Sequence, residues 1–345
     1  MRVGLLGAGR IGSFHAAVLA ALDEVDELLV GDADAGRAAE LATGLAARLG
    51  GARVRPVPAV DDVFASGVDA VVIATATASH AGLITRAARA GLPAFCEKPV
   101  ALDVAGTAAA LREVSAAGTL LQIGFQRRFD AGYRAAREAL RSGRLGRVHT
   151  IRAVTSDAAP PPAEFLPLSG GLVRDCMVHD FDAVRWLTGR EVVEVFARGS
   201  DAGAAMFREA GDVDTAAALL TLDDGTLVTA TATRCNGAGY DVRMELSGEL
   251  DQWAVGLDGR TPVTSAEPGG PAAPARPWPD FLERFEGAYR AELAAFAGAV
   301  AGGGASPCPG AEGLRALLVA EACELSRREN RPVRVAEAAA AAGIG

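Results

Sequence analysis

Short apolar runs alternate with alanine-rich stretches over the first 125 residues of the chain. The apolar runs end, in order, at Leu6, Leu29–Val30, Ala74, Phe95 and Ile123. Segments of helix-forming composition lie between them, for example residues 37–49 and 81–90. Residues 70–74 (AVVIA) are apolar without a break, which is typical of a parallel strand buried on both faces. The pattern predicts successive βαβ units, and therefore an α/β fold with a doubly wound parallel sheet of the Rossmann type.

The pattern of apolar and polar positions changes after Arg147. Residues 215–222 and 226–234 are predicted as two strands joined by a turn with the sequence Asp-Asp-Gly. Threonines alternate with Val228, Ala230 and Ala232 in the second of these strands, so its two faces differ in polarity. An α+β domain with a largely antiparallel, open sheet is therefore expected after the first domain.

Three helices are predicted around this second sheet. Residues 130–141 form a helix with Asp130 as its N-cap, placed to link the two domains. Residues 281–301 and 311–330 form two more, after a loop over residues 267–279 that is rich in Pro and Gly and expected to be mobile. We divide the chain into a cofactor-binding domain over residues 1–125 and a substrate-binding and oligomerisation domain over residues 126–345.

Composition excludes several classes of partner. Half of the 345 residues are hydrophobic and 22% are charged, as in packed globular proteins. The formal charge is −9, and no basic cluster is long enough to grip a phosphate backbone, which argues against nucleic acid. The apolar run at the N-terminus is too short for a signal peptide or a membrane span, so we expect a cytoplasmic protein without a membrane partner.

The cysteines indicate a reducing environment and no metal. They are five in number and widely scattered, without a CxxC pair: Cys96, Cys176, Cys235, Cys308 and Cys323. We expect reduced thiols and no structural metal site.

A glycine motif follows directly after the first predicted strand. Its six residues form a GxGxxG pattern and open the first helix: Gly7, Ala8, Gly9, Arg10, Ile11 and Gly12. The glycines permit a tight turn, a close approach to a pyrophosphate and close packing of helix on strand, and the helix N-terminus favours the anion. The alternative is an ordinary glycine-rich turn. Asp32, 20 residues past the motif, is placed to bind the adenosine ribose of NAD, whereas Asp34 is placed to cap the next helix.

A lysine follows the apolar run that ends at Phe95, within the segment Cys96-Glu97-Lys98-Pro99. Ligands of open α/β sheets bind at the carboxyl ends of the strands, so we expect Glu97 and Lys98 to face the nicotinamide, together with Ala74 and Thr75 at the end of the apolar run 70–74. The alternative is a surface lysine in a connecting loop.

A carboxylate and an imidazole are four residues apart on a helix predicted from about residue 174 to Gly189. Asp175 and His179 therefore share one face, and the carboxylate can orient the imidazole as a general base requires. A capping Asp beside a hydrogen-bonded core His is the alternative. Metal binding is the weaker third interpretation, because no second His or Cys lies at ligand spacing.

Several motifs together resemble a known family. They are, in chain order, GAGRIG (7–12), CEKP (96–99), GFQRRFDAGY (124–133), APPP (159–162), SGGLVRDCMVHDFDAVRWL (169–187), EAGDVDTA (209–216), GYD (239–241) and FLERFEGAY (281–289). They resemble the glucose-fructose oxidoreductase, inositol dehydrogenase and MocA family, and within it bacterial inositol 2-dehydrogenases. The resemblance covers nearly the whole chain.

The resemblance implies a function and a set of site residues. It implies NAD-dependent oxidation of a ring alcohol by a homo-oligomer, commonly a tetramer or else a dimer, that associates through the open sheet. Lys98, Asp175 and His179 match the family's catalytic trio. The resemblance also implies that the trio contacts the substrate. It places three further residues where the family contacts polyol hydroxyls: Arg127, Asp157 and Tyr240.

Two departures from the inositol dehydrogenase pattern concern the substrate pocket. Ser156 stands before Asp157 where an Arg is usual, and Ala238 stands where YGYD would place a Tyr. Both changes predict a wider or differently polar pocket. Oxidation of a cyclitol is the favoured function, with a hexose or aminosugar as the alternative substrate. An NAD-dependent glycoside hydrolase is a less favoured class, and the catalytic trio argues against a silent nucleotide sensor.

Overall fold

The computed structural model describes residues 1–49 and 53–344. The chain divides into two compact units, the first comprising Met1–Gln126 and Tyr289–Leu314 and the second Arg127–Ala288 and Arg315–Gly345. The first segment of unit 1 ends one residue after the expected boundary. Residues 289–314, which we expected in the second domain, belong instead to unit 1.

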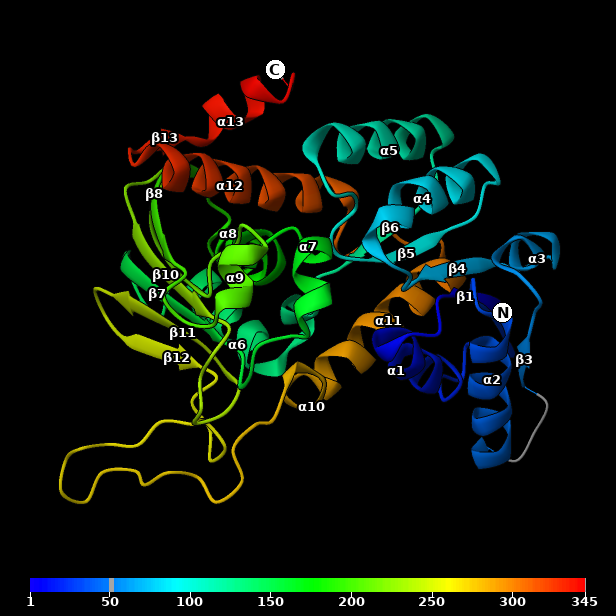
Figure 1. Cartoon of the computed structure of the whole chain (residues 1–345), viewed down its shortest axis with the longest axis horizontal. Helices are drawn as coiled ribbons and strands as arrows, with labels where there is room; N and C mark the ends of the chain where they lie inside the picture. Colours follow the sequence, from blue (N-terminus) through cyan, green and yellow to red (C-terminus); the bar gives the residue numbers. More distant parts are fainter. Residues whose placement is uncertain (50–52, 345) are drawn as a thin grey trace. The chain divides into compact units, whose positions relative to one another are not determined.

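Unit 1 contains a parallel sheet of six described strands (Figure 1). They are β1 (Arg2–Leu6), β2 (Glu27–Gly31), β3 (Val54–Pro56), β4 (Ala70–Ile73), β5 (Ala94–Glu97) and β6 (Leu121–Gly124), in the order β3-β2-β1-β4-β5-β6. Every pairing is parallel. This is the strand order of a Rossmann sheet, and the order reverses between β1 and β4. The predicted fold class is confirmed, with short β3 as a strand that the hydrophobic pattern did not indicate.

Helices follow the strands of unit 1 as the βαβ pattern predicts. They are α1 (Arg10–Leu19), α2 (Ala35–Leu49), α3 (Val60–Ala65), α4 (His80–Arg89) and α5 (Val104–Ala117). A segment far along the chain contributes to the same core, because Leu293 and Phe296 of α11 (Glu286–Gly302) are buried with Leu5 and Phe95. The Phe95 and Phe296 rings lie 5.9 Å apart between centroids. This packing explains why residues 289–314 belong to unit 1.

Unit 2 is built on a mixed, mostly antiparallel sheet. Its described strands are β7 (Val148–Ser156), β8 (Val192–Ser200), β9 (Thr215–Leu222), β10 (Leu227–Thr233), β11 (Asp241–Gly248), β12 (Gln252–Val255) and β13 (Val333–Arg334). The order is β12-β11-β7-β10-β9-β8-β13, and only β7 and β10 pair in parallel. The predicted hairpin is β9 and β10, and Val228, Ala230 and Ala232 are buried while Thr229 and Thr231 are exposed. The predicted alternation of faces is confirmed.

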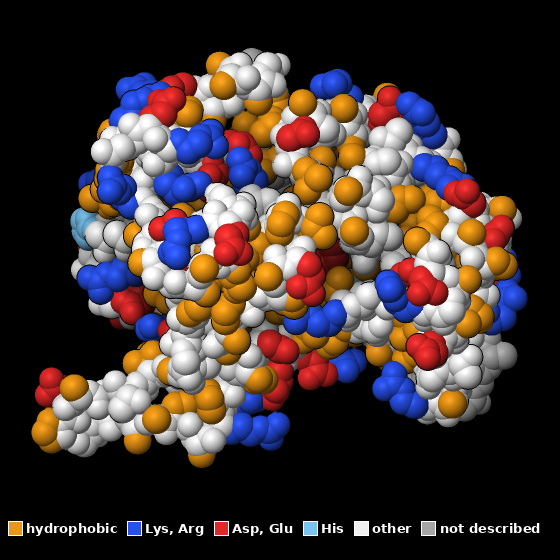
Figure 2. All heavy atoms as spheres, viewed as in Figure 1, with side chains coloured by type: hydrophobic (Ala, Val, Ile, Leu, Met, Phe, Trp, Pro, Cys, Tyr) orange, Lys and Arg blue, Asp and Glu red, His pale blue; other side chains and the backbone are white. Residues whose placement is uncertain are grey.

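The remaining helices are α6 (Ala131–Arg141), α7 (Leu166–Ser169), α8 (Val178–Thr188), α9 (Ala205–Glu209), α10 (Phe281–Arg284), α12 (Gly310–Glu329) and α13 (Val335–Ala341). Asp130 caps α6 as predicted, since its carboxylate accepts from the backbone N–H of Gly132 and Tyr133. The single helix expected over residues 281–301 is divided at Phe285 into α10 and α11. Residues 257–279 form a long loop without helix or strand, whose surface carries few charged side chains (Figures 1 and 2).

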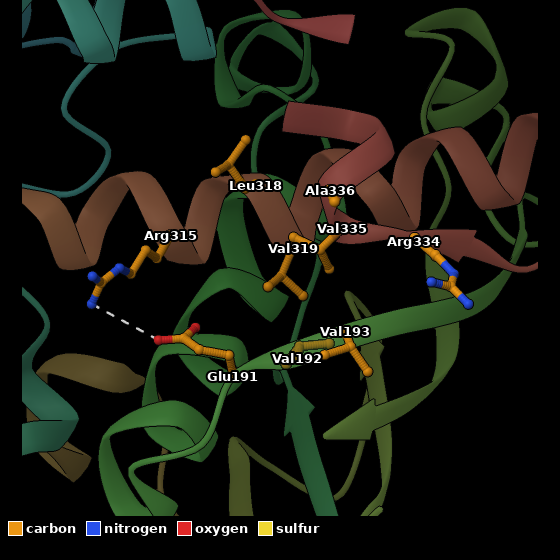
Figure 3. Close-up of a pocket in the computed structure, with 9 residues that line it drawn as sticks. All are labelled: Glu191, Val192, Val193, Arg315, Leu318, Val319, Arg334, Val335 and Ala336. Atoms are coloured by element: carbon orange, nitrogen blue, oxygen red, sulfur yellow. Dashed lines mark ion pairs between the residues drawn. The ribbon is translucent and has the colours of Figure 1, made fainter. Parts of the chain in front are cut away.

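Unit 2 also contains a cavity of about 380 Å³ that is open to the surface (Figure 3). Its lining comes from β8, β13, α12 and α13 and includes Glu191, Val319 and Arg334. None of its lining residues is a predicted site residue. No helix in the described part of the chain combines the length and the hydropathy needed to cross a bilayer.

Candidate active site

The glycine motif forms a tight turn between β1 and α1. Gly7 has a φ of +102°, and a Cβ there would lie 2.6 Å from the carbonyl oxygen of Ala74. A Cβ at Gly12 would lie 2.0 Å from the carbonyl oxygen of Gly7, so helix and strand pack closely only with glycine there. A Cβ at Gly9, by contrast, would meet no atom within 4 Å. The motif therefore leaves open space at its middle glycine, as a bound pyrophosphate requires.

The N-terminus of α1 suits an anion. Gly9 is its N-cap and supplies no side-chain hydrogen bond, and the first turn carries no acidic residue. The first backbone N–H groups of a helix have no partner within it, and the helix dipole favours negative charge there. Ala8 is buried in the turn, Ile11 is half-buried and Arg10 is exposed. These residues fit the pyrophosphate of a dinucleotide.

Asp32 follows β2 and is 7% exposed. Its carboxylate accepts hydrogen bonds from the backbone N–H of Ala8 (2.6 Å) and of Asp34 (2.8 Å). A carboxylate has about four acceptor positions, so capacity remains for ribose hydroxyls. Asp34 accepts from the backbone N–H of Gly36 (2.9 Å) and Arg37 (3.2 Å) at the start of α2, which is the predicted capping role. Asp32 thus also ties the glycine turn to the end of the neighbouring strand.

The other predicted cofactor residues follow β4 and β5. Ala74 and Thr75 come directly after β4, next to the Gly7 turn. Glu97 ends β5, and its Oε1 lies 2.6 Å from Nε2 of His15. Lys98 is half-buried, and its peptide bond to Pro99 is cis. The structure therefore gathers the predicted residues of unit 1 at the carboxyl ends of four adjacent strands, where ligands of such sheets bind.

The composition singles out Lys98 in a way that our motif analysis missed. Of the 34 lysine and arginine residues in the chain, Lys98 alone is a lysine. The other 33 of these residues are arginines. A compact ammonium differs from a planar guanidinium in shape and in hydrogen-bonding geometry. The single exception to the use of arginine therefore indicates a position where the ammonium itself is needed.

Asp175 and His179 lie where α8 begins, but the helix differs from the one predicted. Residues 173–177 form a π-helical turn, and regular α-helix starts only at Val178. The helix ends at Gly189, as predicted, in a left-handed conformation. Single π-turns inside helices are frequent at functional sites. Both side chains are half-buried, and the predicted pairing of Asp175 with His179 stays a prediction.

Arg234 is a central residue of this region that the sequence analysis missed. It directly follows β10, is 3% exposed, and donates from Nη2 to Oδ2 of Asp175 (2.7 Å). Its Nη1 donates to Oδ2 of Asp157 (3.1 Å) and to Sγ of Cys176 (2.9 Å). Burial opposes its charge, but Cys176 and the carboxylates of Asp175 and Asp157 raise the pKa of Arg234 above its ordinary value. The structure thus joins two predicted site carboxylates through one buried guanidinium.

Arg127 has partners within the protein. It is 2% exposed, forms an ion pair with Asp180, and donates from Nη2 to Oγ1 of Thr155 (2.9 Å). Burial opposes its charge, but the Asp180 carboxylate raises the pKa of Arg127 above its ordinary value. The Arg127 guanidinium is therefore already paired with Asp180 and Thr155 inside unit 2.

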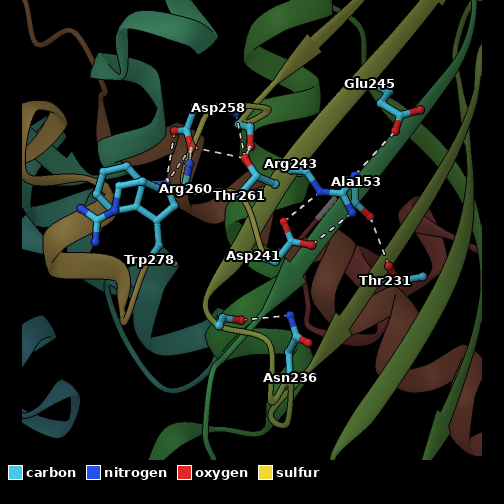
Figure 4. A network of polar contacts seen from close by, with 12 residues as sticks. Ala153, Thr231, Asn236, Asp241, Arg243, Glu245, Asp258, Arg260, Thr261 and Trp278 are labelled. Carbon is cyan, nitrogen blue, oxygen red and sulfur yellow. Dashed lines mark hydrogen bonds and ion pairs between the residues drawn. The ribbon is translucent and has the colours of Figure 1, made fainter. Parts of the chain in front are cut away.

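Tyr240 is buried at the end of a turn that several hydrogen bonds fix in place. Its backbone N–H donates to the carbonyl of Trp278 (2.8 Å), and the Asn236 amide donates to the carbonyl of Gly239 (2.9 Å; Figure 4). The Trp278 ring is itself covered by Arg260, whose guanidinium carbon lies 3.8 Å from the ring centroid (Figure 4). Burial raises the pKa of Tyr240 well above its ordinary value, so its hydroxyl stays protonated.

Comparison with known families identifies the fold. The description "Oxidoreductase family, NAD-binding Rossmann fold" matches residues 1–125, and "GFO/IDH/MocA C-terminal domain" matches residues 133–252. The chain belongs to the GFO/IDH/MocA oxidoreductase family. The predicted family, the NAD cofactor and the oxidoreductase class are thereby confirmed.

Members of the family with similar sequences are named for inositol. The chain is 39% identical over 326 residues to the myo-inositol dehydrogenase Hyg17 of Streptomyces leeuwenhoekii, covering 93% of this chain and 96% of that protein. It is 37% identical over 337 residues to an inositol 2-dehydrogenase of Rhizobium meliloti, covering 97% and 99%.

Solved structures of the family have the same fold. A myo-inositol dehydrogenase from Corynebacterium glutamicum superposes with a TM-score of 0.87 at 32% identity, over 97% of this chain and 98% of the other. A scyllo-inositol dehydrogenase from Lactobacillus casei, solved with bound NAD(H) and scyllo-inositol, gives 0.84 at 28% identity, over 97% and 99%.

Proposed function

We propose that this GFO/IDH/MocA family member is an NAD-dependent dehydrogenase that oxidises a secondary ring alcohol of a cyclitol to the ketone. The observation that carries the proposal is the near-full-length similarity to proteins named inositol dehydrogenases. The substrate is a small polyol. The fit of the glycine turn, the α1 N-terminus and Asp32 to a dinucleotide supports the cofactor.

Each unit has its own task in this proposal. NAD, when bound, accepts the hydride from the alcohol carbon. Unit 1 holds it with the glycine turn, Asp32, Ala74, Thr75 and Glu97. The protein supplies orientation and the handling of the alcohol proton.

Three side chains handle the reacting alcohol. His179 accepts the hydroxyl proton as general base, and Asp175 orients His179 and favours its charged form. Lys98 donates a hydrogen bond to the same oxygen and stabilises its developing negative charge. Asp157 and Tyr240 bind further hydroxyls. Arg127, already bonded to Asp180 and Thr155, supports the polar wall of the site.

The two departures from the inositol dehydrogenase pattern bear on the substrate. Ser156 is buried, whereas Ala238 is exposed beside the Tyr240 turn. Small side chains at both positions favour a cyclitol or sugar with an additional substituent. A hexose or aminosugar is the alternative substrate, and a glycoside hydrolase that regenerates its NAD is the alternative class.

We further propose that the enzyme acts in the cytoplasm as a homo-oligomer, a tetramer or a dimer. The exposed Leu219 and Leu227 on one face of the unit 2 sheet support association through that face. Light scattering on the purified protein measures the assembly, and a monomer at micromolar concentration contradicts it.

The function is tested by spectrophotometry. The protein is incubated with NAD and with myo-, scyllo- or chiro-inositol, glucose or an aminosugar, and NADH is measured at 340 nm. Stoichiometric NADH with at least one cyclitol is expected, together with its loss in Lys98→Ala. Turnover of a glycoside without NADH accumulation would instead identify the hydrolase. No NADH with any cyclitol contradicts the proposal.

A further inference from the structure

Two buried histidines bind the residues on either side of Lys98. His15 of α1 is fully buried, and its Nε2 lies 2.6 Å from Oε1 of Glu97. His80, the first residue of α4, is 1% exposed, and its Nδ1 lies 2.7 Å from the carbonyl oxygen of Pro99. All these residues belong to unit 1. We propose that His15 and His80 are positioning residues that fix the backbone of Lys98.

The link through His15 is rigid. Its ring packs edge-on against Phe95 (centroids 5.7 Å apart) and Tyr289 (5.8 Å). The Glu97 carboxylate is also confined on its far side, because a Cβ at Gly124 would lie only 2.9 Å from Oε2. A carboxylate only accepts hydrogen bonds, so Nε2 of His15 carries the proton in this pair. The pair connects the helix that follows the glycine turn to the residue before Lys98.

The link through His80 joins two loops. Its Nε2 lies 3.0 Å from the carbonyl oxygen of Thr75, in addition to the contact between Nδ1 and Pro99. Both partners are carbonyl oxygens, which only accept, so both bonds form together only when the imidazole carries both protons. A neutral ring keeps one bond. The bond to Pro99 is the shorter one and is the one that bears on Lys98.

These two links matter because Lys98 must place one ammonium on one oxygen. Its side chain has four rotatable bonds, so the position of its backbone limits where the nitrogen can settle. A mutation far from the reacting atoms that displaces a catalytic group by about 1 Å can lower the rate roughly 100-fold. This inference rests on the proposed role of Lys98 at the reacting oxygen.

Isosteric substitutions separate positioning from simple packing. The amide nitrogen of Asn falls near Nδ1 of a histidine, and that of Gln near Nε2. His15→Gln keeps the bond to Glu97 and His15→Asn loses it, whereas His80→Asn keeps the bond to Pro99 and His80→Gln loses it. We expect kcat within about threefold of wild type in the two variants that keep the bond, and a fall of roughly tenfold or more in the two that lose it. Gln is therefore the better replacement for His15, and Asn is the better replacement for His80.

Lys98 supplies a readout that does not need activity. Reductive methylation with ¹³C-formaldehyde labels only Lys98 and the α-amino group, because the chain has no other lysine. We expect the dimethyl-Lys98 NMR signal to shift in His15→Asn and His80→Gln and to stay in His15→Gln and His80→Asn. His149→Gln is the control, since His149 lies on β7 with 53% of its side chain exposed.

The outcomes are distinguishable. Equal signals and equal kcat in the Asn and Gln variants at either position overturn the positioning role of that histidine. If the NMR pattern holds but wild type oxidises no cyclitol, the proposed function fails and the positioning role stands. If substitution of His15 prevents folding, Glu97 is replaced instead. Glu97→Gln keeps an acceptor for His15 and must leave the Lys98 NMR signal unchanged, whereas Glu97→Leu must shift it. The same shift in both variants overturns the link between His15 and Lys98.

Discussion

Arg234 and Asp175 are joined by a hydrogen bond of 2.7 Å between Nη2 and Oδ2. The same guanidinium also binds Asp157, so one buried cation compensates two carboxylates of the proposed site. If Asp175 orients His179 as proposed, a carboxylate that is already paired with a cation stabilises the imidazolium less than a lone carboxylate would. We therefore expect Arg234 to influence the pH dependence of the proposed base.

Replacing Arg234 tests this balance through the pH profile. In Arg234→Met the two carboxylates lose their cation and favour the charged form of His179, so the acidic limb of kcat/KM moves to higher pH, by about one unit. Arg234→Lys keeps the charge and shifts the limb less. The exposed Arg190→Met is the matched control. An unchanged limb in Arg234→Met would assign the base to a group that Asp175 does not influence.

Lys98→Arg tests whether charge alone suffices at this position. The guanidinium keeps the positive charge but is broad and planar, so it cannot place a single N–H on the reacting oxygen in the same way. We expect kcat to fall roughly 100-fold or more, as in Lys98→Ala, with NADH affinity within about threefold of wild type. Stopped-flow turnover and fluorescence titration with NADH measure the two quantities. Near wild-type turnover would show that any cation serves.

Features set by local sequence and chain order could be predicted. The strand–glycine–helix motif and the run of βαβ units specify a Rossmann sheet, because parallel strands need crossovers and those crossovers are visible in the pattern. The placement of residues 289–314 could not be predicted. The apolar positions Leu293 and Phe296 show that α11 is buried, but not in which core.

Arg234 and His15 escaped prediction because their partners are distant in the sequence. Arg234 is 59 residues from Asp175, and His15 is 82 residues from Glu97. No periodicity connects such pairs, so only the fold reveals them. The π-helical turn before α8 is similarly invisible, since its residues fit a regular helix equally well. That Lys98 is the single lysine could have been found from the sequence by counting residues.

Glu27 gives unit 1 a pH-dependent contribution to stability. Its carboxylate accepts from Nε of Arg55 and of Arg2, each at 2.5 Å. Partial burial opposes its ionisation, but these hydrogen bonds lower the pKa of Glu27 below its usual 4.5. The unfolded chain therefore binds the proton more readily, so the contribution is complete above pH 4.5 and is lost as pH falls through the lower, folded-state pKa.

Glu27→Gln should accordingly destabilise the protein at neutral pH and not in acid. We expect a loss of at most about 1 kcal/mol at pH 7, because the pair is partly exposed and screened by solvent. The difference from wild type should vanish towards about pH 3, with urea midpoints as the measurement. Glu40→Gln, on the exposed surface of α2, is the control. A deficit that persists unchanged in acid would mean that packing, rather than charge, explains it.

Asp32 should decide the choice between NAD and NADP. In NAD the adenosine ribose offers hydroxyls to this carboxylate, whereas NADP carries a 2′-phosphate that repels it. We expect at least tenfold higher kcat/KM with NAD, corresponding to about 1.4 kcal/mol. Asp32→Ser should narrow this ratio and also weaken NAD binding, because the N–H groups of Ala8 and Asp34 lose their acceptor. Asp34→Ser is the matched control, since serine caps helices well and the preference for NAD should remain. Steady-state kinetics with both cofactors measure the ratio, and equal efficiency in the wild-type enzyme would move the ribose contact from Asp32 to Asp34 or another residue.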